Sequence, residues 1–249
     1  MATGAVVITG ASRGIGAATA ALAASRGYAV GVNYRENRGA AEAVVGRITA
    51  SGGRAIAIRA DVSSESDVVR LFDTVDGDLG PITALVNNAG ILARQTTVAE
   101  MDAERLRAIF ATNVIGAFLC AREAVKRMST RRGGSGGAIV NVSSAAARLG
   151  SPREYVDYAA SKGAVDTMTI GLSKEVAADG IRVNAVRPGL IYTEIHAMGG
   201  EPARVDRLKT AMPMQRGGDP EEVARAILWL LSDEASYSTG TFIDATGGW

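Results

Sequence analysis

The sequence has few of the residues that build disulfides and metal sites. It contains one cysteine, Cys120, and one histidine, His196, among 249 residues. A single cysteine cannot form an intrachain disulfide, which fits a reducing compartment, and a small buried role suits its helical context. Because no His/Cys cluster of ligand spacing exists, we expect no metal site. His196 lies in an irregular stretch, where we expect an exposed loop residue or a substrate contact.

The sequence also has no excess of either charge. The 27 basic and 26 acidic residues give a net charge of +1, and 47% of residues are hydrophobic. A basic surface that would favour nucleic acid or an anionic membrane is therefore absent. No apolar run approaches the ~20 residues of a membrane helix, and MATGAVVITG lacks the basic start of a signal peptide. We expect a cytoplasmic protein without nucleic-acid or membrane partners.

Short apolar runs rich in β-branched residues alternate with longer helical patterns along the whole chain. Continuous apolar strands are typical of a sheet covered on both faces, and the alternation predicts parallel strands joined by crossover helices. The predicted strands are residues 5–9, 28–33, 54–59, 83–87, 138–142, 181–186 and 241–245. The predicted helices are residues 14–26, 37–51, 65–77, 102–129, 156–179 and 219–232.

These elements predict one α/β domain over residues 1–249, a doubly wound, Rossmann-like fold with about seven parallel strands. Residues 190–215 interrupt the pattern, have no strand signature and include two glycines and two prolines. So long an irregular segment in a compact domain is often a lid over a site. We therefore expect residues 190–215 to cover a binding cavity.

The segment EYVDYAASKGAVD holds two tyrosines, of which one has a lysine four residues further on. In a helix that spacing places Lys162 beside Tyr158, whereas Tyr155 is followed at the same distance by an alanine. A positive charge within about 4–6 Å favours the phenolate, so we expect Lys162 to lower the pKa of Tyr158. Tyr158 would then serve as a general acid or base, while Tyr155 lines the substrate pocket or packs in the core.

The first predicted strand runs into TGASRGIG, with glycines at positions 10, 14 and 16 before a helix. Glycine allows a positive φ and lets a pyrophosphate approach the backbone, while the helix N-terminus offers free N–H groups. The spacing departs from the usual Gly-x-Gly-x-x-Gly pattern. It still indicates a dinucleotide-binding turn.

The residues after the second strand indicate which dinucleotide is bound. NAD enzymes of this architecture carry a carboxylate there for the ribose 2′-hydroxyl, but this chain has Asn33, Tyr34 and Arg35 before Glu36. Arg13 lies in the glycine turn. Because guanidinium groups bind phosphate well, Arg13 and Arg35 predict NADP(H); the alternative is that Arg35 is merely exposed at a strand end.

Five motifs occur in a fixed order: TGxxxGIG, NNAG, NVSS, YxxxK and a PG turn. In this order they resemble the short-chain dehydrogenase/reductase family, especially 3-oxoacyl-carrier-protein reductases and glucose- or ribitol-dehydrogenase-like members. The resemblance covers Ala5 to Gly248. The enoyl reductases of the superfamily have a wider tyrosine–lysine spacing than Tyr158 and Lys162.

The resemblance implies roles for matching residues. Tyr158 would exchange the substrate proton, Lys162 would lower its pKa and bind the nicotinamide ribose, and Asn113 would hold a water in the proton relay. Ser144 would bind the substrate oxygen; because its spacing to the tyrosine is one residue longer than usual, Ser143 is the alternative. The expected cofactor contacts are Gly10, Ser12, Arg13, Gly14, Ile15, Gly16, Asn33, Tyr34, Arg35, Asp61, Val62, Asn87, Ala89, Gly90, Tyr158, Lys162, Pro188, Ile191 and Thr193.

Together these features predict an NADP-dependent oxidoreductase acting on a small-molecule carbonyl/alcohol pair. Two long helices, 102–129 and 156–179, are small or apolar around much of their circumference, and such faces usually mark interfaces. With the resemblance, this predicts a homotetramer. The alternative function is a non-catalytic NADP-binding sensor or scaffold, against which both Tyr158 and Lys162 argue.

Overall fold

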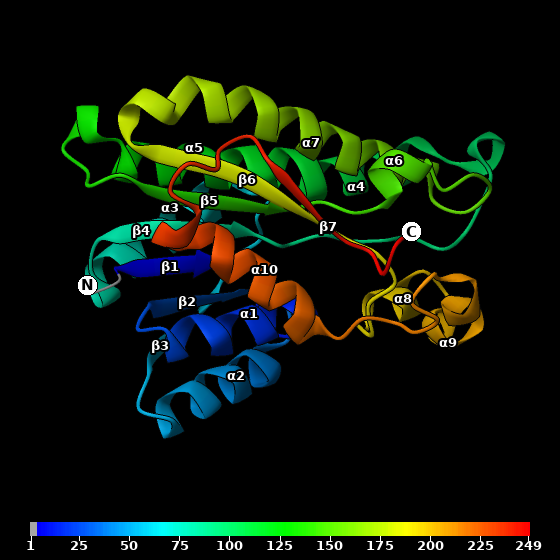
Figure 1. Ribbon diagram of the computed structural model, residues 1–249, viewed down its shortest axis with the longest axis horizontal. Coiled ribbons are helices and arrows are strands. Elements are labelled where there is room, and N and C mark those ends of the chain that lie inside the picture. Colours follow the sequence, from blue (N-terminus) through cyan, green and yellow to red (C-terminus); the bar gives the residue numbers. More distant parts are fainter. Residues whose placement is uncertain (1–3) are drawn as a thin grey trace.

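The computed structural model describes residues 4–249, so residues 1–3 of the expected domain lie outside the described part. A single sheet of seven parallel strands, in the order β3-β2-β1-β4-β5-β6-β7, forms its centre (Figure 1). This confirms the predicted α/β class. The strands are β1 (Ala5–Ile8), β2 (Ala29–Tyr34), β3 (Arg54–Arg59), β4 (Ile82–Asn87), β5 (Gly137–Val142), β6 (Ile181–Pro188) and β7 (Phe242–Ala245).

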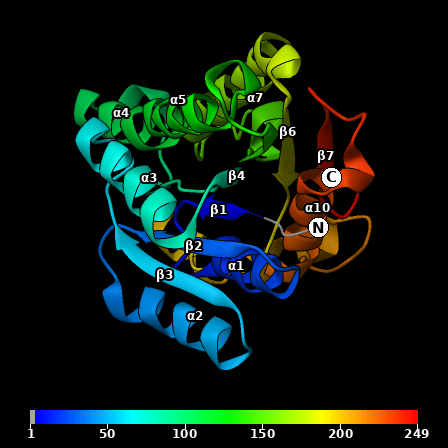
Figure 2. The same ribbon diagram turned by 90° about the vertical axis from the view of Figure 1, so that its left-hand side faces the viewer.

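Helices cover both faces of the sheet, which explains why the strands read as continuous apolar runs. Figure 2 shows one layer on either side of the sheet, and a separate apolar core fills the space under each. One layer contains α1 (Gly14–Ser25), α2 (Arg38–Ala50) and α10 (Pro220–Leu231). The other contains α3 (Glu65–Leu79), α4 (Ala103–Phe110), α5 (Gly116–Met128) and α7 (Val156–Val176).

Local sequence fixes where several helices begin. The Asn37 side chain accepts a hydrogen bond from Ala40 N at 3.0 Å and caps α2. Asp219 and Glu222 form a capping box at α10, with proline in its first turn. Within residues 4–249, α1 receives no side-chain cap, and its first turn carries no acidic residue. The N–H groups at the start of α1 are therefore left for another acceptor.

The predicted helix 102–129 contains a wider turn that its sequence did not predict. Residues Ala111–Ile115 form a π-helical segment between α4 and α5. Such segments are frequent at functional sites. By length and composition alone the continuous helix Ala103–Met128 could cross a membrane, although charged residues interrupt its apolar run. In the structure it packs against β4, α3 and α7.

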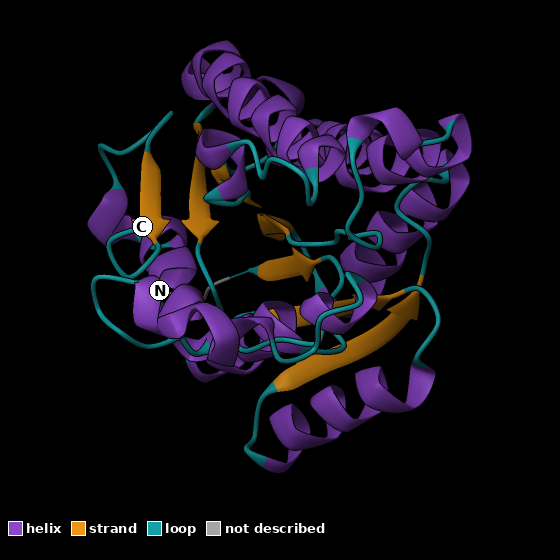
Figure 3. Cartoon of the chain, turned by 90° about the vertical axis from the view of Figure 1, so that its right-hand side faces the viewer, coloured by secondary structure: helices purple, strands orange, loops and turns teal. Residues whose placement is uncertain are grey.

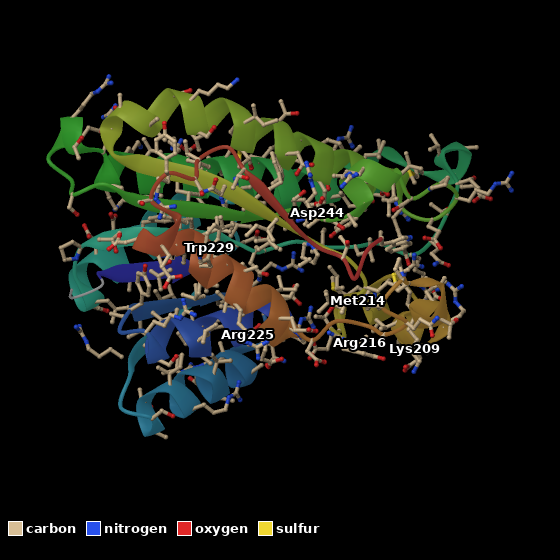
Figure 4. The ribbon with its side chains drawn as sticks, in the orientation of Figure 1. Lys209, Met214, Arg216, Arg225, Trp229 and Asp244 are labelled. Carbon is tan, nitrogen blue, oxygen red and sulfur yellow. The ribbon has the colours of Figure 1, made fainter. Side chains whose placement is uncertain are left out.

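The lid, residues 190–215, lies beyond the carboxyl ends of the strands, as Figure 3 shows from that end of the molecule. It is more regular than the sequence predicted, with α8 (Ile195–Met198) and α9 (Arg204–Leu208). Another short helix, α6 (Ala146–Leu149), follows β5. Lys209 and Met214 belong to the part of the lid that returns toward α10 (Figure 4).

Candidate active site

A cavity of about 380 Å³ opens at the carboxyl ends of the strands, between the glycine turn, the loop after β4, α7 and the lid. Parallel sheets bind ligands at this edge, where neighbouring connections leave in opposite directions. Most predicted site residues line it: Gly10, Ser12, Arg13, Gly14, Ile15, Asn33, Tyr34, Arg35, Asp61, Val62, Ala89, Gly90, Ser144, Tyr158, Lys162, Pro188, Ile191 and Thr193. Gly16, Asn87 and Asn113 lie outside this lining.

The glycine turn has the geometry that its sequence predicts. Gly10 and Gly14 have φ values of 61° and 53°, which glycine adopts without strain. A Cβ atom on Gly16 would lie 2.5 Å from the Gly10 carbonyl oxygen, so Gly16 allows close packing. The Asn88 side chain donates to the Thr9 and Gly10 carbonyls at 2.9 and 3.0 Å and fixes the turn to β4.

Two of the predicted cofactor residues have their side-chain amides engaged by the protein. Asn33 accepts a hydrogen bond from Gly10 N at 3.1 Å and donates to the Ala60 carbonyl at 2.9 Å. The Asn33 side chain therefore links the glycine turn to the residue that follows β3. Asn87 is buried, and its amide donates to the Asn141 side chain at 2.9 Å within the sheet.

The two serines that end β5 point to different partners. The Ser143 hydroxyl donates to the Lys162 carbonyl at 3.3 Å, inside the protein. The Ser144 hydroxyl accepts from Ala146 N at 3.1 Å and is hydrogen-bonded to the Tyr158 side chain. Of the pair, Ser144 is thus the serine next to the phenol in the cavity wall.

Lys162 is buried behind Tyr158 and is held by the strand end. Its ammonium donates to the Val142 carbonyl at 2.8 Å and lies 5.6 Å from the centre of the Tyr158 ring. Burial lowers the pKa of Lys162 to about 8, against which the charge of Asp166 acts. The lysine therefore changes its charge near physiological pH.

The expectation of a lowered pKa for Tyr158 is wrong. Burial raises the pKa of Tyr158 to about 12, and the hydrogen bond with Ser144 offsets this in part. The ammonium lies near the ring, as the four-residue spacing predicts, but burial also desolvates the phenol, and desolvation disfavours the phenolate. Tyr158 is consequently a neutral phenol, able to donate a proton.

Asn113, in the π-helical segment, joins three parts of the site. Its side-chain oxygen accepts from Ile91 N at 2.8 Å, while its amide donates to the Ile91 carbonyl and the Ser161 hydroxyl, each at 3.1 Å. It thereby fastens the loop after β4 to α7. Both N–H groups of its amide are used in these contacts.

Three residues expected to lie outside the catalytic machinery can be compared with the structure. His196 is buried rather than exposed: its Nε2 contacts the Ile191 carbonyl at 2.9 Å, and burial lowers its pKa. Tyr155 both packs and lines the cavity, and its hydroxyl donates to the Gly199 carbonyl at 3.4 Å. Buried Cys120 agrees with the predicted packing role, and burial raises its pKa to about 12.

Comparison with known proteins identifies this arrangement. A family model described as enoyl-(acyl carrier protein) reductase matches residues 10–249. An uncharacterized oxidoreductase of Escherichia coli, YgfF, is 64% identical over 97% of this chain and 98% of its own. A 3-oxoacyl-[acyl-carrier-protein] reductase of Synechocystis is 40% identical, covering 97% of this chain and 95% of its own.

The chain belongs to the short-chain dehydrogenase/reductase family. A solved short-chain type dehydrogenase/reductase from Mycobacterium marinum superimposes with a TM-score of 0.92 at 36% identity, covering 99% of this chain and 95% of that chain. A second structure, a dehydrogenase/reductase from Sinorhizobium meliloti, gives 0.91 at 31% identity and covers 100% and 95%. As a member of this family, the protein is an oxidoreductase that binds a nicotinamide cofactor.

The site fits such a cofactor on its own geometry. The uncapped N-terminus of α1 and the two positive-φ glycines form a cradle for a pyrophosphate. At Gly90, an added Cβ would come within 3.5 Å of the Asn113 side-chain oxygen and 3.6 Å of the Lys162 ammonium. Glycine thus leaves the space between the loop and the lysine open.

We predict that Asn113→Ala lowers the free energy of unfolding by about 2–4 kcal/mol, because it leaves both backbone groups of Ile91 without their buried partner. Urea denaturation followed by circular dichroism measures this. Asn37→Ala is the matched control: it removes an exposed helix cap and should cost about 1 kcal/mol. An Asn113→Ala variant no less stable than this control would contradict the assigned role.

Proposed function

We propose that the protein is an NADP(H)-dependent oxidoreductase that transfers a hydride between the nicotinamide and a carbonyl/alcohol substrate, with Tyr158 as general acid/base. The observation that carries the proposal is the trio of Ser144, Tyr158 and Lys162 in one wall of the cavity. Hydroxyls beside a developing alkoxide stabilise its charge and supply its proton. The same trio argues against a binding-only sensor.

Each residue has one task in the proposed reduction. The cofactor supplies the hydride, and the chain must bind the carbonyl oxygen and protonate it. The Ser144 hydroxyl orients that oxygen next to the Tyr158 phenol, which is neutral and gives up its proton as the alkoxide forms. Lys162, protonated at neutral pH, stabilises the resulting phenolate and carries a hydrogen-bond donor toward the ribose.

NADP(H) is preferred in this proposal because two arginines lie at the expected 2′ position. Arg35 lines the cavity and pairs with Glu36 at 2.6 Å, but both side chains are exposed, so the pair is weak. A phosphate, with its two negative charges, would compete for it. Arg13 is exposed, donates to the Met198 sulfur at 3.5 Å and reaches the same cavity.

A second candidate is reduction of an enoyl thioester, favoured by the description of the matching family model. The four-residue spacing of Tyr158 and Lys162 supports carbonyl chemistry instead. A panel of 3-oxoacyl esters, quinones, ketones, sugars and a crotonyl thioester, followed by NADPH absorbance, separates the two. Turnover of the crotonyl thioester alone would overturn the carbonyl proposal. No turnover of any compound in the panel would favour the non-catalytic sensor.

We further propose a cytoplasmic homotetramer. Large apolar side chains are exposed on the α4–α5–α7 layer, among them Leu106, Phe118 and Ile170 at 39%, 53% and 43%. On the opposite side, Trp229 of α10 is 37% exposed (Figure 4). Two separate apolar faces would serve the two different contacts that a tetramer needs.

We predict that Tyr158→Phe lowers kcat at least about 10²–10⁴-fold, because it removes the positioned proton donor, while the dissociation constant for NADPH changes little. Tyr155→Phe, which loses one long hydrogen bond at 3.4 Å, should be much milder. Steady-state kinetics and fluorescence titration of NADPH measure both. Equal losses of activity in the two variants would show that Tyr158 is not the acid.

We predict that kcat/KM is higher with NADPH than with NADH by about two orders of magnitude, because charge-assisted hydrogen bonds from Arg13 and Arg35 act on the 2′-phosphate alone. Arg35→Asp should weaken NADPH strongly and leave NADH unchanged or improved. Arg47→Asp, an equal charge change at an exposed position on α2, is the control. Equal kcat/KM values for both coenzymes in the unchanged protein would contradict this reading of the arginines.

A further inference from the structure

The end of the cavity nearest the lid has mostly apolar walls. Tyr155 lies one helical turn before Tyr158, and both line the cavity. Leu92 and the Tyr155 ring meet at Gly199, where an added Cβ would lie 3.0 Å from the leucine and 2.6 Å from the tyrosine oxygen. Met198 and Trp249 line the cavity as well. A substrate carbonyl at Tyr158 would therefore carry its remaining atoms along these side chains.

Besides Arg13, whose guanidinium donates to the Met198 sulfur at 3.5 Å, the cation that lines the same region is Arg204 of α9. Arg204 is 7% exposed, and its guanidinium carbon lies 5.3 Å from the centre of the Tyr155 ring. Such a position could recognise a carboxylate or a phosphate if the charge were free. His196, the neighbouring basic residue of the lid, contacts a backbone carbonyl through Nε2, and burial lowers its pKa, so it is neutral.

The charge of Arg204 is already matched by two carboxylates. Its guanidinium donates to both oxygens of Glu154, at 3.1 and 2.5 Å, and to Glu201 at 2.8 Å. Glu201 also accepts from Gln95 at 2.9 Å and pairs with Arg207. The Arg207 guanidinium, together with Arg204, lowers the pKa of Glu201 to about 2, so this carboxylate is ionised throughout the working range.

This cluster of two arginines and two glutamates has no net charge and joins distant parts of the chain. Glu154 belongs to the segment before α7, whereas Glu201 and Arg204 belong to the lid. Among the described residues, Arg204 belongs to the lining of the cavity, whereas both glutamates that pair with it lie outside that lining. An entering anion would meet a neutralised guanidinium backed by two fixed negative charges.

We propose that Glu154 and Glu201 are specificity-determining residues: by neutralising Arg204 they make the site accept uncharged carbonyl compounds and reject carboxylates and phosphates. The inference rests on the proposed carbonyl reductase function and adds the class of substrate to it. A substrate anion loses its hydration on entering this apolar end, where Arg204 is already neutralised by its own carboxylates and Arg13 is engaged by the 2′-phosphate in the proposed function. Juxtaposed like charges add to the discrimination.

Levulinate, levulinamide and ethyl levulinate test this directly, because they present the same ketone with and without a negative charge. In the unchanged protein we expect kcat/KM for the amide and the ester to exceed that for the anion by about 100-fold. The same three compounds are titrated calorimetrically into the protein loaded with oxidised coenzyme. There we expect the amide to bind at least about tenfold more tightly than the anion.

The variant Glu154→Gln/Glu201→Gln frees the charge of Arg204 while keeping the size of both side chains. We expect the preference for the amide over levulinate to fall at least about tenfold, in turnover and in binding. Glu42→Gln, which removes an exposed ion pair on α2, is the control and should leave the ratio unchanged. Thermal melting of each variant separates loss of fold from loss of selectivity.

Three results would overturn the proposal. Levulinate could bind or react as well as levulinamide in the unchanged protein. The double variant could keep the original ratio while remaining folded. Arg204→Gln could abolish levulinate binding selectively, which would make Arg204 a receptor for anions. Failure of the reductase function itself would be seen differently, as coenzyme-loaded protein that binds levulinamide over levulinate but turns over none of the ketones.

Discussion

A buried ammonium group, held by one backbone carbonyl, organises the active site. Lys162 of α7 donates to the carbonyl of Val142, the last residue of β5, at 2.8 Å. The contact joins the helix that carries Tyr158 to the strand end that carries Ser144. Because burial lowers the pKa of Lys162 from 10.5 to about 8, the charged form costs about 3 kcal/mol of folding free energy at neutral pH, and this cost disappears as pH rises from 8 through 10.5. A cost of this size is typical of functional sites, where the buried charge is needed for chemistry.

Side-chain amides hold the loops around this contact in place. Asn33 and Asn88 both bond to the glycine turn, and Asn113 fixes the loop after β4 to α7. Asn33 and Asn113 both donate and accept, and Asn88 donates twice, so these amides satisfy backbone groups that the ends of parallel strands leave unpaired. The chain thereby presents a preorganised cradle, while the remaining polar groups of the cavity stay available for cofactor and substrate. The lid is attached differently, through the ion pairs of Arg204 and through Tyr155.

The sequence was sufficient to predict the order of strands and helices, because β-branched runs and helical patterns alternate clearly. It also placed Lys162 beside Tyr158, since a four-residue spacing within a helix is a local property. What it did not predict depends on tertiary structure. The burial of His196 and the pairing of Arg204 with Glu154, fifty residues away, follow from how the lid folds back on α7. The pKa of Tyr158 was predicted in the wrong direction because a nearby charge can be read from spacing, whereas desolvation requires the complete cavity.

The pH dependence of ketone reduction tests most directly whether a protonated Lys162 beside a neutral Tyr158 performs the proton transfer. Burial lowers the pKa of Lys162 to about 8 and raises that of Tyr158 to about 12, so the phenol keeps its proton where the lysine loses its charge. With an uncharged ketone, kcat/KM should stay constant up to about pH 8 and then fall by about tenfold for each further pH unit. A value that is constant up to about pH 10, or that rises with pH, would contradict this assignment of charges.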